Sequence, residues 1–261
     1  MSASIALDIA TSFRRPDPGQ LLIEKRKSAM IRQLLANGLG VKCHTDPVQF
    51  REFFRQAEGY DPASPLDVAF VDLDPSKFFC VQILDPKHRP IGICCGRVID
   101  AQWYRGGLQS WLRRQRLFAD RSPPLWAPDI IVEGEASRMQ GRLGYVGGGW
   151  INPSWRNRGL IGFAVQLVHA QLVGHYRCDH LIGFVRPKLR GLALSEEGYG
   201  FRHETRAVSP YFAGTGYGEE MYFVYASRIE VMQRFSSTRG PQYHDYMPPG
   251  HEKSGQMRIV S

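Results

Sequence analysis

The chain has 261 residues, 43% hydrophobic and 22% charged, which excludes wholesale disorder and collagen-like or coiled-coil architecture. Lys and Arg number 33 against 25 Asp and Glu, so the formal net charge is +8 and an anionic partner is a reasonable first expectation. The longest strongly apolar stretch, Leu160 to Val168, is shorter than the ~20 residues that cross a bilayer. Asp8 interrupts the apolar run that a secretory signal would need, so we expect a cytoplasmic protein without a membrane span.

Residues 1–38 are interpreted as an extension that contains one basic helix. The segment from Pro16 to Gly19 breaks regular structure, and a helix is predicted from Leu21 to Ala36, where apolar positions alternate with four basic residues. Asn37 and Gly38 supply the stop. Such a helix can contact nucleic acid or a membrane, or it can pack on the main domain with its charged face in water.

Residues 39–235 are predicted to form one mixed α/β domain. Runs of β-forming residues indicate strands, and apolar residues at helical spacing indicate helices. In chain order, these patterns predict a strand at Gly40–His44, a helix beginning at Asp46 and Pro47, an antiparallel hairpin of Phe78–Leu84 and Ile91–Ile99, an inserted helix at Gly106–Phe118, a strand at Leu143–Ile151, a helix at Leu160–His175, a strand at His180–Val185, a short helix near Leu189–Glu197, and strands near His203–Val208 and Glu220–Ala226.

The predicted strand, crossover helix and strand between Leu143 and Val185 imply a parallel pair, because a right-handed crossover is the favoured connection between such strands. The insertion covers about residues 100–128 and suggests either a packing helix or a lid. Residues 236–261 contain Ser, Gly and Pro clusters that predict a flexible tail. Five cysteines without a Cys-x-x-Cys spacing predict reduced, mostly buried thiols.

The stretch from Gly147 to Gly162 is the most informative part of the sequence. It places a glycine-rich strand, a basic turn and a helix start one after another. Glycines inside a strand favour a bulge, and the free N–H groups of a helix N-terminus attract phosphate. Arg156 and Arg158 can add charge-assisted contacts. No Walker A sequence and no Gly-x-Gly-x-x-Gly fingerprint occurs at this turn, so a different phosphate-bearing ligand is indicated.

The pattern Ile151-x-Pro153-x-Trp155-Arg156-x-x-Gly159 resembles the acyl-CoA-binding motif of the GCN5-related N-acetyltransferase (GNAT) superfamily. The family pattern ends in Gly or Ala two residues after the first glycine, whereas this chain has Ile161 there and Gly162 one residue later. The resemblance covers roughly residues 39–226. It implies a mixed β-sheet, splayed at its centre and flanked by helices.

The resemblance also implies an enzyme that moves an acetyl group from acetyl-CoA to a primary amine by direct attack, without a metal. The residues expected to bind acetyl-CoA are Gly149, Trp150, Ile151, Arg156, Asn157, Arg158, Gly159, Leu160, Ile161 and Gly162. A main-chain N–H near Trp150 or Ile151 would polarise the thioester carbonyl. The acceptor is left open among polyamines, antibiotics, amino acids, aminoacyl-tRNA and protein amines.

Candidates for proton transfer follow from the same resemblance. Glu133 and Glu135 precede the key strand and are the expected general bases, acting directly or through water. The position where many relatives carry an acid tyrosine is Glu196 here, and Tyr199 and Ser195 are the nearby alternatives.

Two other readings stay open. A nucleic-acid-binding protein is suggested by the basic charge and by tryptophans near arginines, although no recognisable nucleic-acid-binding module is present. A GNAT-like protein that binds CoA without catalysis, as a sensor, is suggested by the absent tyrosine. A zinc site at His169, His175, Cys178 and His180 is disfavoured because the spacing matches no common zinc pattern.

Overall fold

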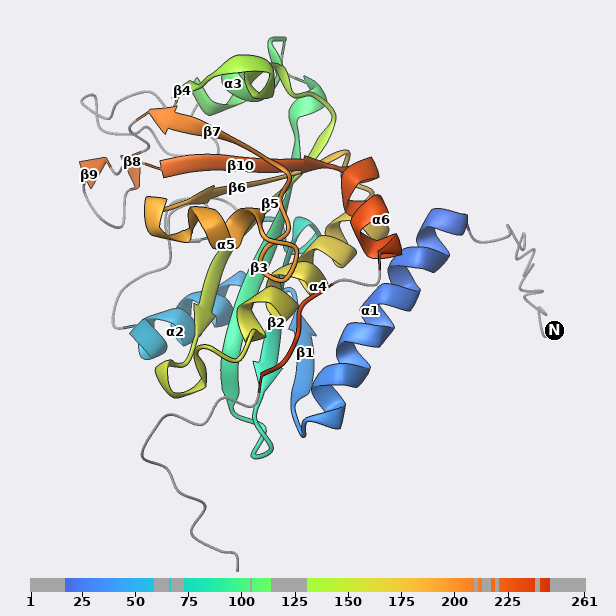
Figure 1. Cartoon of the computed structure of the whole chain (residues 1–261). Helices are drawn as coiled ribbons and strands as arrows, with labels where there is room; N and C mark the ends of the chain where they lie inside the picture. Colours follow the sequence, from blue (N-terminus) through green and yellow to red (C-terminus); the bar gives the residue numbers. More distant parts are fainter. Residues whose placement is uncertain are drawn as a thin grey trace, which may run out of the picture.

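The computed structural model describes residues 17–58, 66, 73–103, 105–113, 131–208, 211–212, 217–218, 221–237 and 240–244. Within these residues an eight-stranded mixed sheet has the order β1-β2-β3-β5-β6-β10-β7-β4, and β8 and β9 form a separate pair (Figure 1). The strands are β1 (Gly40–His44), β2 (Phe78–Leu84), β3 (Pro90–Asp100), β4 (Ile131–Val132), β5 (Arg142–Ile151), β6 (His180–Val185), β7 (His203–Val208), β8 (Tyr211–Phe212), β9 (Tyr217–Gly218) and β10 (Met221–Ser227).

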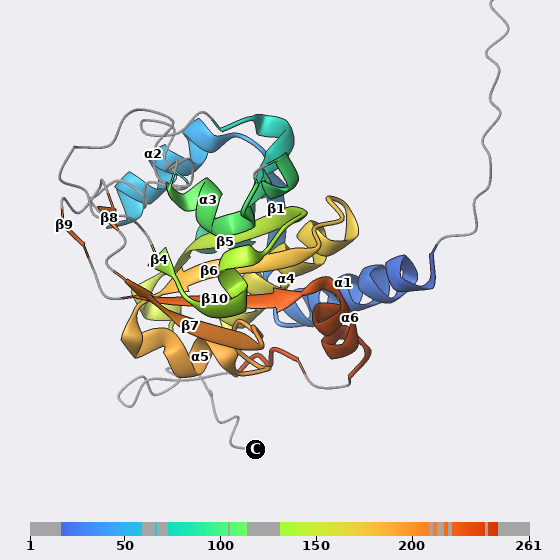
Figure 2. The same cartoon turned by 90° about the horizontal axis from the view of Figure 1, so that it is seen from above.

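Helices cover both faces of this sheet. They are α1 (Pro18–Ala36), α2 (Pro47–Glu58), α3 (Gly107–Arg113), α4 (Leu160–Gly174), α5 (Arg190–Leu194) and α6 (Arg228–Ser236), with short 3₁₀ turns at η2 (Pro75–Lys77), η3 (Ala101–Trp103), η4 (Gly134–Arg138), η5 (Pro153–Trp155) and η6 (Pro187–Leu189). Figure 2 shows α2 and α3 on one side of the sheet and α1, α4, α5 and α6 on the other.

Each face has its own hydrophobic core. On one face, α4 lies between the sheet and α1, and apolar side chains cover nearly its whole circumference because it is enclosed on both sides. On the other face, Phe50 and Phe54 of α2 and Trp111 of α3 pack against Tyr145 and Trp150 of β5. The strand β5 is therefore held between the two cores.

All strand pairs of the large sheet are antiparallel except β5 with β6. That parallel pair has only three Cα partners, which are Leu143 with His180, Gly144 with Leu181 and Tyr145 with Ile182. Past this point β5 runs on to Ile151 and β6 to Val185, and in the described range 131–208 they pair no further with each other, although β5 stays paired with β3 and β6 with β10. The two strands therefore diverge, and the predicted fold class, a mixed sheet splayed at its centre and flanked by helices, is confirmed.

The structure differs from the sequence prediction at the ends of several helices. Helix α1 begins at Pro18 rather than Leu21, because the Asp17 side chain caps it by accepting from Gly19 N at 3.1 Å and proline is favourable in the first turn. Helix α5 stops at Leu194, since Ser195 is extended. Helix α3 ends at Arg113, and the rest of the predicted inserted helix lies outside the described residues.

Helix α6 was missed by the sequence analysis, which left residues 227–235 without an element. Its signal is a capping box, in which the Ser227 side chain accepts from Glu230 N and the Glu230 side chain accepts from Ser227 N. Residues 240–244, which were assigned to a flexible tail, also differ from the prediction. They pack against the domain, with Gly240 and Pro241 buried.

All five cysteines lie in the described part of the chain and are free thiols, and four of them are buried while Cys43 is exposed. The expectation of mostly buried thiols is confirmed. Among the helices that the structure describes, none is both long and apolar enough to span a membrane.

Candidate functional site

A β-bulge marks the point where β5 leaves β6. The pairing of β5 with β3 shifts register between Ile93 and Cys95, opposite Gly147 to Trp150. Gly148 lies in the left-handed region with φ 61°, a conformation that glycine adopts without steric cost. The Cys94 thiol, on the neighbouring strand, donates to the Gly147 carbonyl at 3.5 Å. The predicted glycine-rich bulge therefore stands beside the opening in the sheet.

The loop after β5 leads directly into the N-terminus of α4. Asn152 starts it as a cap, since its side chain accepts from Ser154 N at 3.1 Å. The Arg156 side chain turns back and donates through Nε to the Ile151 carbonyl at 3.2 Å. The Arg158 guanidinium stands over the Trp155 ring, 4.7 Å from its centroid. Both arginines are thus held close to the end of β5.

The first turn of α4 presents main-chain donors. Gly159, with φ 74°, is the N-cap residue and provides no capping side chain. In the described part of the chain, the N–H groups of Gly159, Leu160 and Ile161 have no main-chain acceptor, while that of Gly162 donates to Gly159 O at 3.0 Å. Unpaired donors at a helix N-terminus carry partial positive charge, so this turn can bind an anion such as a phosphate.

A second turn, from Ser195 to Gly200, packs against the same end of α4. A Cβ added at Gly162 would collide with the Glu197 carbonyl, so the two turns touch through their backbones. Ser195 Oγ accepts from Gly198 N at 3.0 Å and donates to the Leu192 carbonyl at 3.1 Å. Its hydroxyl is therefore committed to closing the end of α5.

Two buried side chains clamp this second turn from outside. Gln166 of α4 donates through Nε2 to the carbonyls of Glu196 and Gly198, at 2.7 and 3.0 Å. Arg234 of α6 donates through Nη1 to the carbonyls of Gly200 and Tyr199. Sequence reasoning missed both residues, because their partners lie 30 or more positions away along the chain.

The turn carries two of the residues considered for proton transfer. Burial, with a smaller contribution from nearby Cys94, raises the pKa of Tyr199 to about 12, so the phenol is protonated at neutral pH. The Glu196 carboxylate instead forms an ion pair with Arg202 at 3.4 Å on the partly exposed side.

The two candidate bases lie at the other end of β5. Glu133 and Glu135 are exposed on either side of Gly134, where η4 begins. Burial, with added negative charge from Glu135, raises the pKa of Tyr225, and Tyr225 is the Cα partner of Ile182 at the last paired position before the strands diverge. Of the two carboxylates, Glu135 and not Glu133 is among the charges that raise the pKa of Tyr225, together with Glu230.

The residues predicted to bind the cofactor fall into one continuous region. Gly149, Trp150 and Ile151 belong to the half of β5 that pairs with β3 but not with β6, and the segment 156–162 forms the loop and first turn of α4. The sequence analysis did not foresee that residues 240–244 lie against this loop. Its only hint is that Pro241 and Tyr243 are residue types that pack readily.

Within the residues that the structure describes, no group of three or more His, Cys, Asp or Glu is arranged as metal ligands. Among the histidines and the cysteine weighed for zinc, His169 is fully buried in α4 and hydrogen-bonded to Arg234 at 3.0 Å, and Cys178 is buried in the core on the α4 side of the sheet. Both side chains thus have structural surroundings in that core.

Comparisons with known proteins give similar structures but no similar sequence. No protein-family model and no curated protein matches the chain. Similar solved structures include NAA60 from Arabidopsis thaliana in complex with acetyl-CoA, with 11% identity over 72% of this chain and 98% of that chain and a TM-score of 0.41. A mutant of the spermidine N-acetyltransferase SpeG from Vibrio cholerae has 11% identity over 76% and 98%, with a TM-score of 0.43. RimJ from Mycobacterium smegmatis in complex with CoA-disulfide has 11% identity over 75% and 87%, with a TM-score of 0.42.

Proposed function

We propose that this chain is an acyl-CoA-dependent N-acetyltransferase of the GNAT superfamily, which transfers acetyl from acetyl-CoA to a primary amine. The observation that carries the proposal is the continuity of three features. The parallel pair β5–β6 opens after Tyr145, the bulge at Gly148 borders the opening, and β5 then leads into a helix N-terminus whose first N–H groups have no main-chain acceptor among the described residues. A slot beside an anion site is the arrangement that a long thioester with a pyrophosphate requires.

In this proposal the pyrophosphate lies against the first turn of α4, from Gly159 to Gly162. Arg156 and Arg158 supply charge-assisted contacts from the preceding loop. The pantetheine arm runs between the diverging strands β5 and β6, and the thioester lies beside Gly149 to Ile151. There a main-chain N–H can donate to the thioester oxygen as negative charge develops on it.

The reaction forms a C–N bond and breaks the C–S bond. An amine with an ordinary pKa of ~10.4 is protonated at neutral pH, so a base must remove its proton before attack. We assign this role to Glu135 acting through water, with Glu133 as the alternative. Tyr199, whose raised pKa keeps it protonated, is assigned to donate to the departing CoA sulfur. Holding the amine and the thioester together supplies much of the remaining acceleration.

The experiment that tests the proposal is calorimetric titration of the purified chain with acetyl-CoA, desulfo-CoA and ATP. We expect saturable binding of acetyl-CoA and desulfo-CoA, because both carry the pantetheine arm and pyrophosphate, and weak or absent binding of ATP. A screen of amine acceptors, read out as release of free CoA thiol, then tests transfer. A folded sample that binds neither CoA compound would overturn the proposal, and salt-dependent binding to nucleic acid would become the next reading to test.

A further inference from the structure

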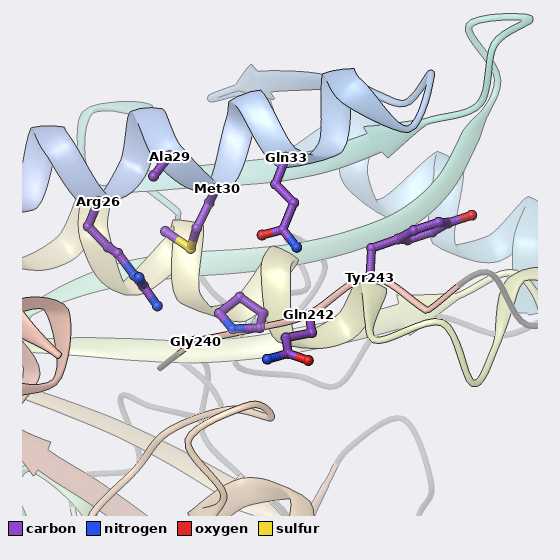
Figure 3. A pocket seen from close by; sticks show the side chains of 8 residues that line it. Arg26, Ala29, Met30, Gln33, Gly240, Gln242 and Tyr243 are labelled. Atoms are coloured by element: carbon purple, nitrogen blue, oxygen red, sulfur yellow. The ribbon is translucent and has the colours of Figure 1, made fainter. Parts of the chain in front are cut away.

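The segment Gly240–His244, here called the strap, runs between α1 and the N-terminal turn of α4. Figure 3 shows it running below α1, whose Met30 and Gln33 side chains point toward it, while the Gln242 side chain points away from α1. Pro241 is buried and Tyr243 packs against the core on the α4 side of the sheet. The strap is thus a docked part of the domain and comes from a region separated by about 80 residues from the loop that it meets.

The strap meets the loop before α4 through several contacts. Arg158 donates through Nη1 to the Tyr243 hydroxyl at 3.1 Å, and His244 N donates to the Arg158 carbonyl at 3.2 Å. A Cβ added at Gly159 would collide with the Gln242 carbonyl oxygen, so that carbonyl lies directly against the N-cap residue of α4. A Cβ added at Gly162 would lie 3.2 Å from Pro241 Cβ.

These contacts involve the same groups that the proposed pyrophosphate site uses. A carbonyl oxygen carries a partial negative charge. The Gln242 carbonyl therefore brings negative charge to the helix N-terminus, as a phosphate would, but less of it. The Tyr243 hydroxyl takes a donor of Arg158 that could otherwise contact a phosphate oxygen. Strap and pyrophosphate therefore compete for one surface.

The strap is not tightly packed on its other side. Between it and α1 lies a pocket of about 300 Å³, lined by Arg26, Ala29, Met30, Gln33 and residues 240–243. Short segments that leave space beside them open at lower free-energy cost than core elements. The strap can therefore leave the loop without unfolding the domain.

We propose that the strap is an autoinhibitory segment that occupies the pyrophosphate surface in the free protein and is displaced when CoA binds. This inference rests on the proposed function, since it specifies how the same site is regulated. A competing internal segment lowers the apparent affinity for CoA by the fraction of molecules in which the site is open. Weakening the strap raises that fraction.

The test measures CoA affinity by calorimetry in three full-length chains. The double variant Pro241→Gly with Tyr243→Ala removes the buried ring of Pro241 and the hydroxyl that accepts from Arg158. His244→Ala is the matched control, because His244 reaches Arg158 through its main-chain N–H, which alanine retains. We expect about tenfold tighter CoA binding by the double variant and less than a twofold change in the control.

Amide hydrogen exchange of the unaltered chain gives a second, independent readout. CoA should speed up exchange of the His244 amide, because its bond to the Arg158 carbonyl is broken when the strap leaves. Unchanged or weaker CoA binding by a folded double variant, or slower exchange at His244 with CoA, would overturn the inference, since the strap would then be inert or part of the CoA site. If no chain binds CoA, including the unaltered one, the proposed function itself fails.

Discussion

Arg234 of α6 donates through Nη2 to Nδ1 of His169 in α4, at 3.0 Å, and both side chains are fully buried. Because Nδ1 accepts this bond, the proton of the neutral imidazole is on Nε2, which has no acceptor among the described residues. The ring also packs edge to face on Phe201, with centroids 4.9 Å apart. This pair joins α6, α4 and the turn after α5 inside one core.

The His169 contact predicts acid sensitivity. Burial, followed by the positive charge of Arg234, holds the pKa of His169 well below its ordinary value, so the folded chain keeps this ring neutral while the unfolded chain protonates it below pH ~6.5. The unfolded state then binds more protons, and stability falls as the pH falls. We expect this group alone to cost about 1.4 kcal/mol of unfolding free energy between pH 7.5 and 5.5.

Urea unfolding at the two pH values measures this loss. His169→Asn is the control, because an amide oxygen can still accept from Arg234 but does not titrate. The loss of unfolding free energy between pH 7.5 and 5.5 should be smaller in His169→Asn than in the unaltered chain, by the contribution stated for His169. Equal losses in the two chains would show that His169 does not titrate differently on folding.

The clamp on the 195–200 turn predicts destabilisation when either of its side chains is removed. Arg234→Met leaves the carbonyls of Tyr199 and Gly200 and His169 Nδ1 without their donor, and Gln166→Leu does the same to the carbonyls of Glu196 and Gly198. A buried polar group left without a partner costs about 1–3 kcal/mol, so we expect each variant to lose unfolding free energy in that range.

Denaturant melts of both variants check this prediction, with Ser236→Ala at the exposed end of α6 as the control. Burial lowers the pKa of Arg234 to about 9, so its guanidinium stays charged at pH 7 without an ion-pairing carboxylate among the described residues. A neutral or stabilising Arg234→Met change would mean that burying this charge costs as much as its hydrogen bonds return.

Gly159 is expected to tolerate no side chain. Its φ of 74° disfavours other residues, and a Cβ would meet the Gln242 carbonyl. Gly159→Val should weaken CoA binding at least tenfold, because the side chain covers the donors of the first turn of α4. Gly191→Ala, in a position where a Cβ meets nothing within 4 Å, is the matched control and should bind normally.

Calorimetric titration of the two folded variants with CoA measures the two affinities. Gly159→Val also displaces the strap, but its side chain covers the surface that the strap leaves. We therefore expect weaker CoA binding from Gly159→Val and tighter CoA binding from the strap variant. Normal CoA affinity in Gly159→Val would remove the first turn of α4 from the proposed site.

Glu135 is expected to influence Tyr225 and Glu133 is not. The negative charge of Glu135 adds to the raised pKa of Tyr225, so Glu135→Gln should lower that pKa and Glu133→Gln should leave it unchanged. Carbon NMR titration of labelled tyrosines measures this without any knowledge of the acceptor. If the pKa of Tyr225 did not change in Glu135→Gln, Glu135 would not lie close to Tyr225, and its assignment as the base would lose its support.

Much of the fold followed from short-range sequence patterns. The strands from Phe78 to Leu84 and from His180 to Val185 have the predicted bounds because alternation and β-branching act over a few residues. The loop from Ile151 to Gly159 was singled out because its proline, arginine and glycine stand at the spacing of a known family motif. Helix α6 was missed although its Ser227–Glu230 capping box is equally local.

Sequence alone thus predicted most of the elements, the glycine-rich bulge and the loop that leads into α4, since each depends on backbone preferences within a few residues. Only the tertiary structure decided that Arg234 meets His169, which is 65 positions away, and that Tyr243 meets Arg158, which is 85 positions away. Those contacts arise from how α1, α4 and α6 pack together, and side-chain packing between distant segments leaves no periodic pattern in the chain.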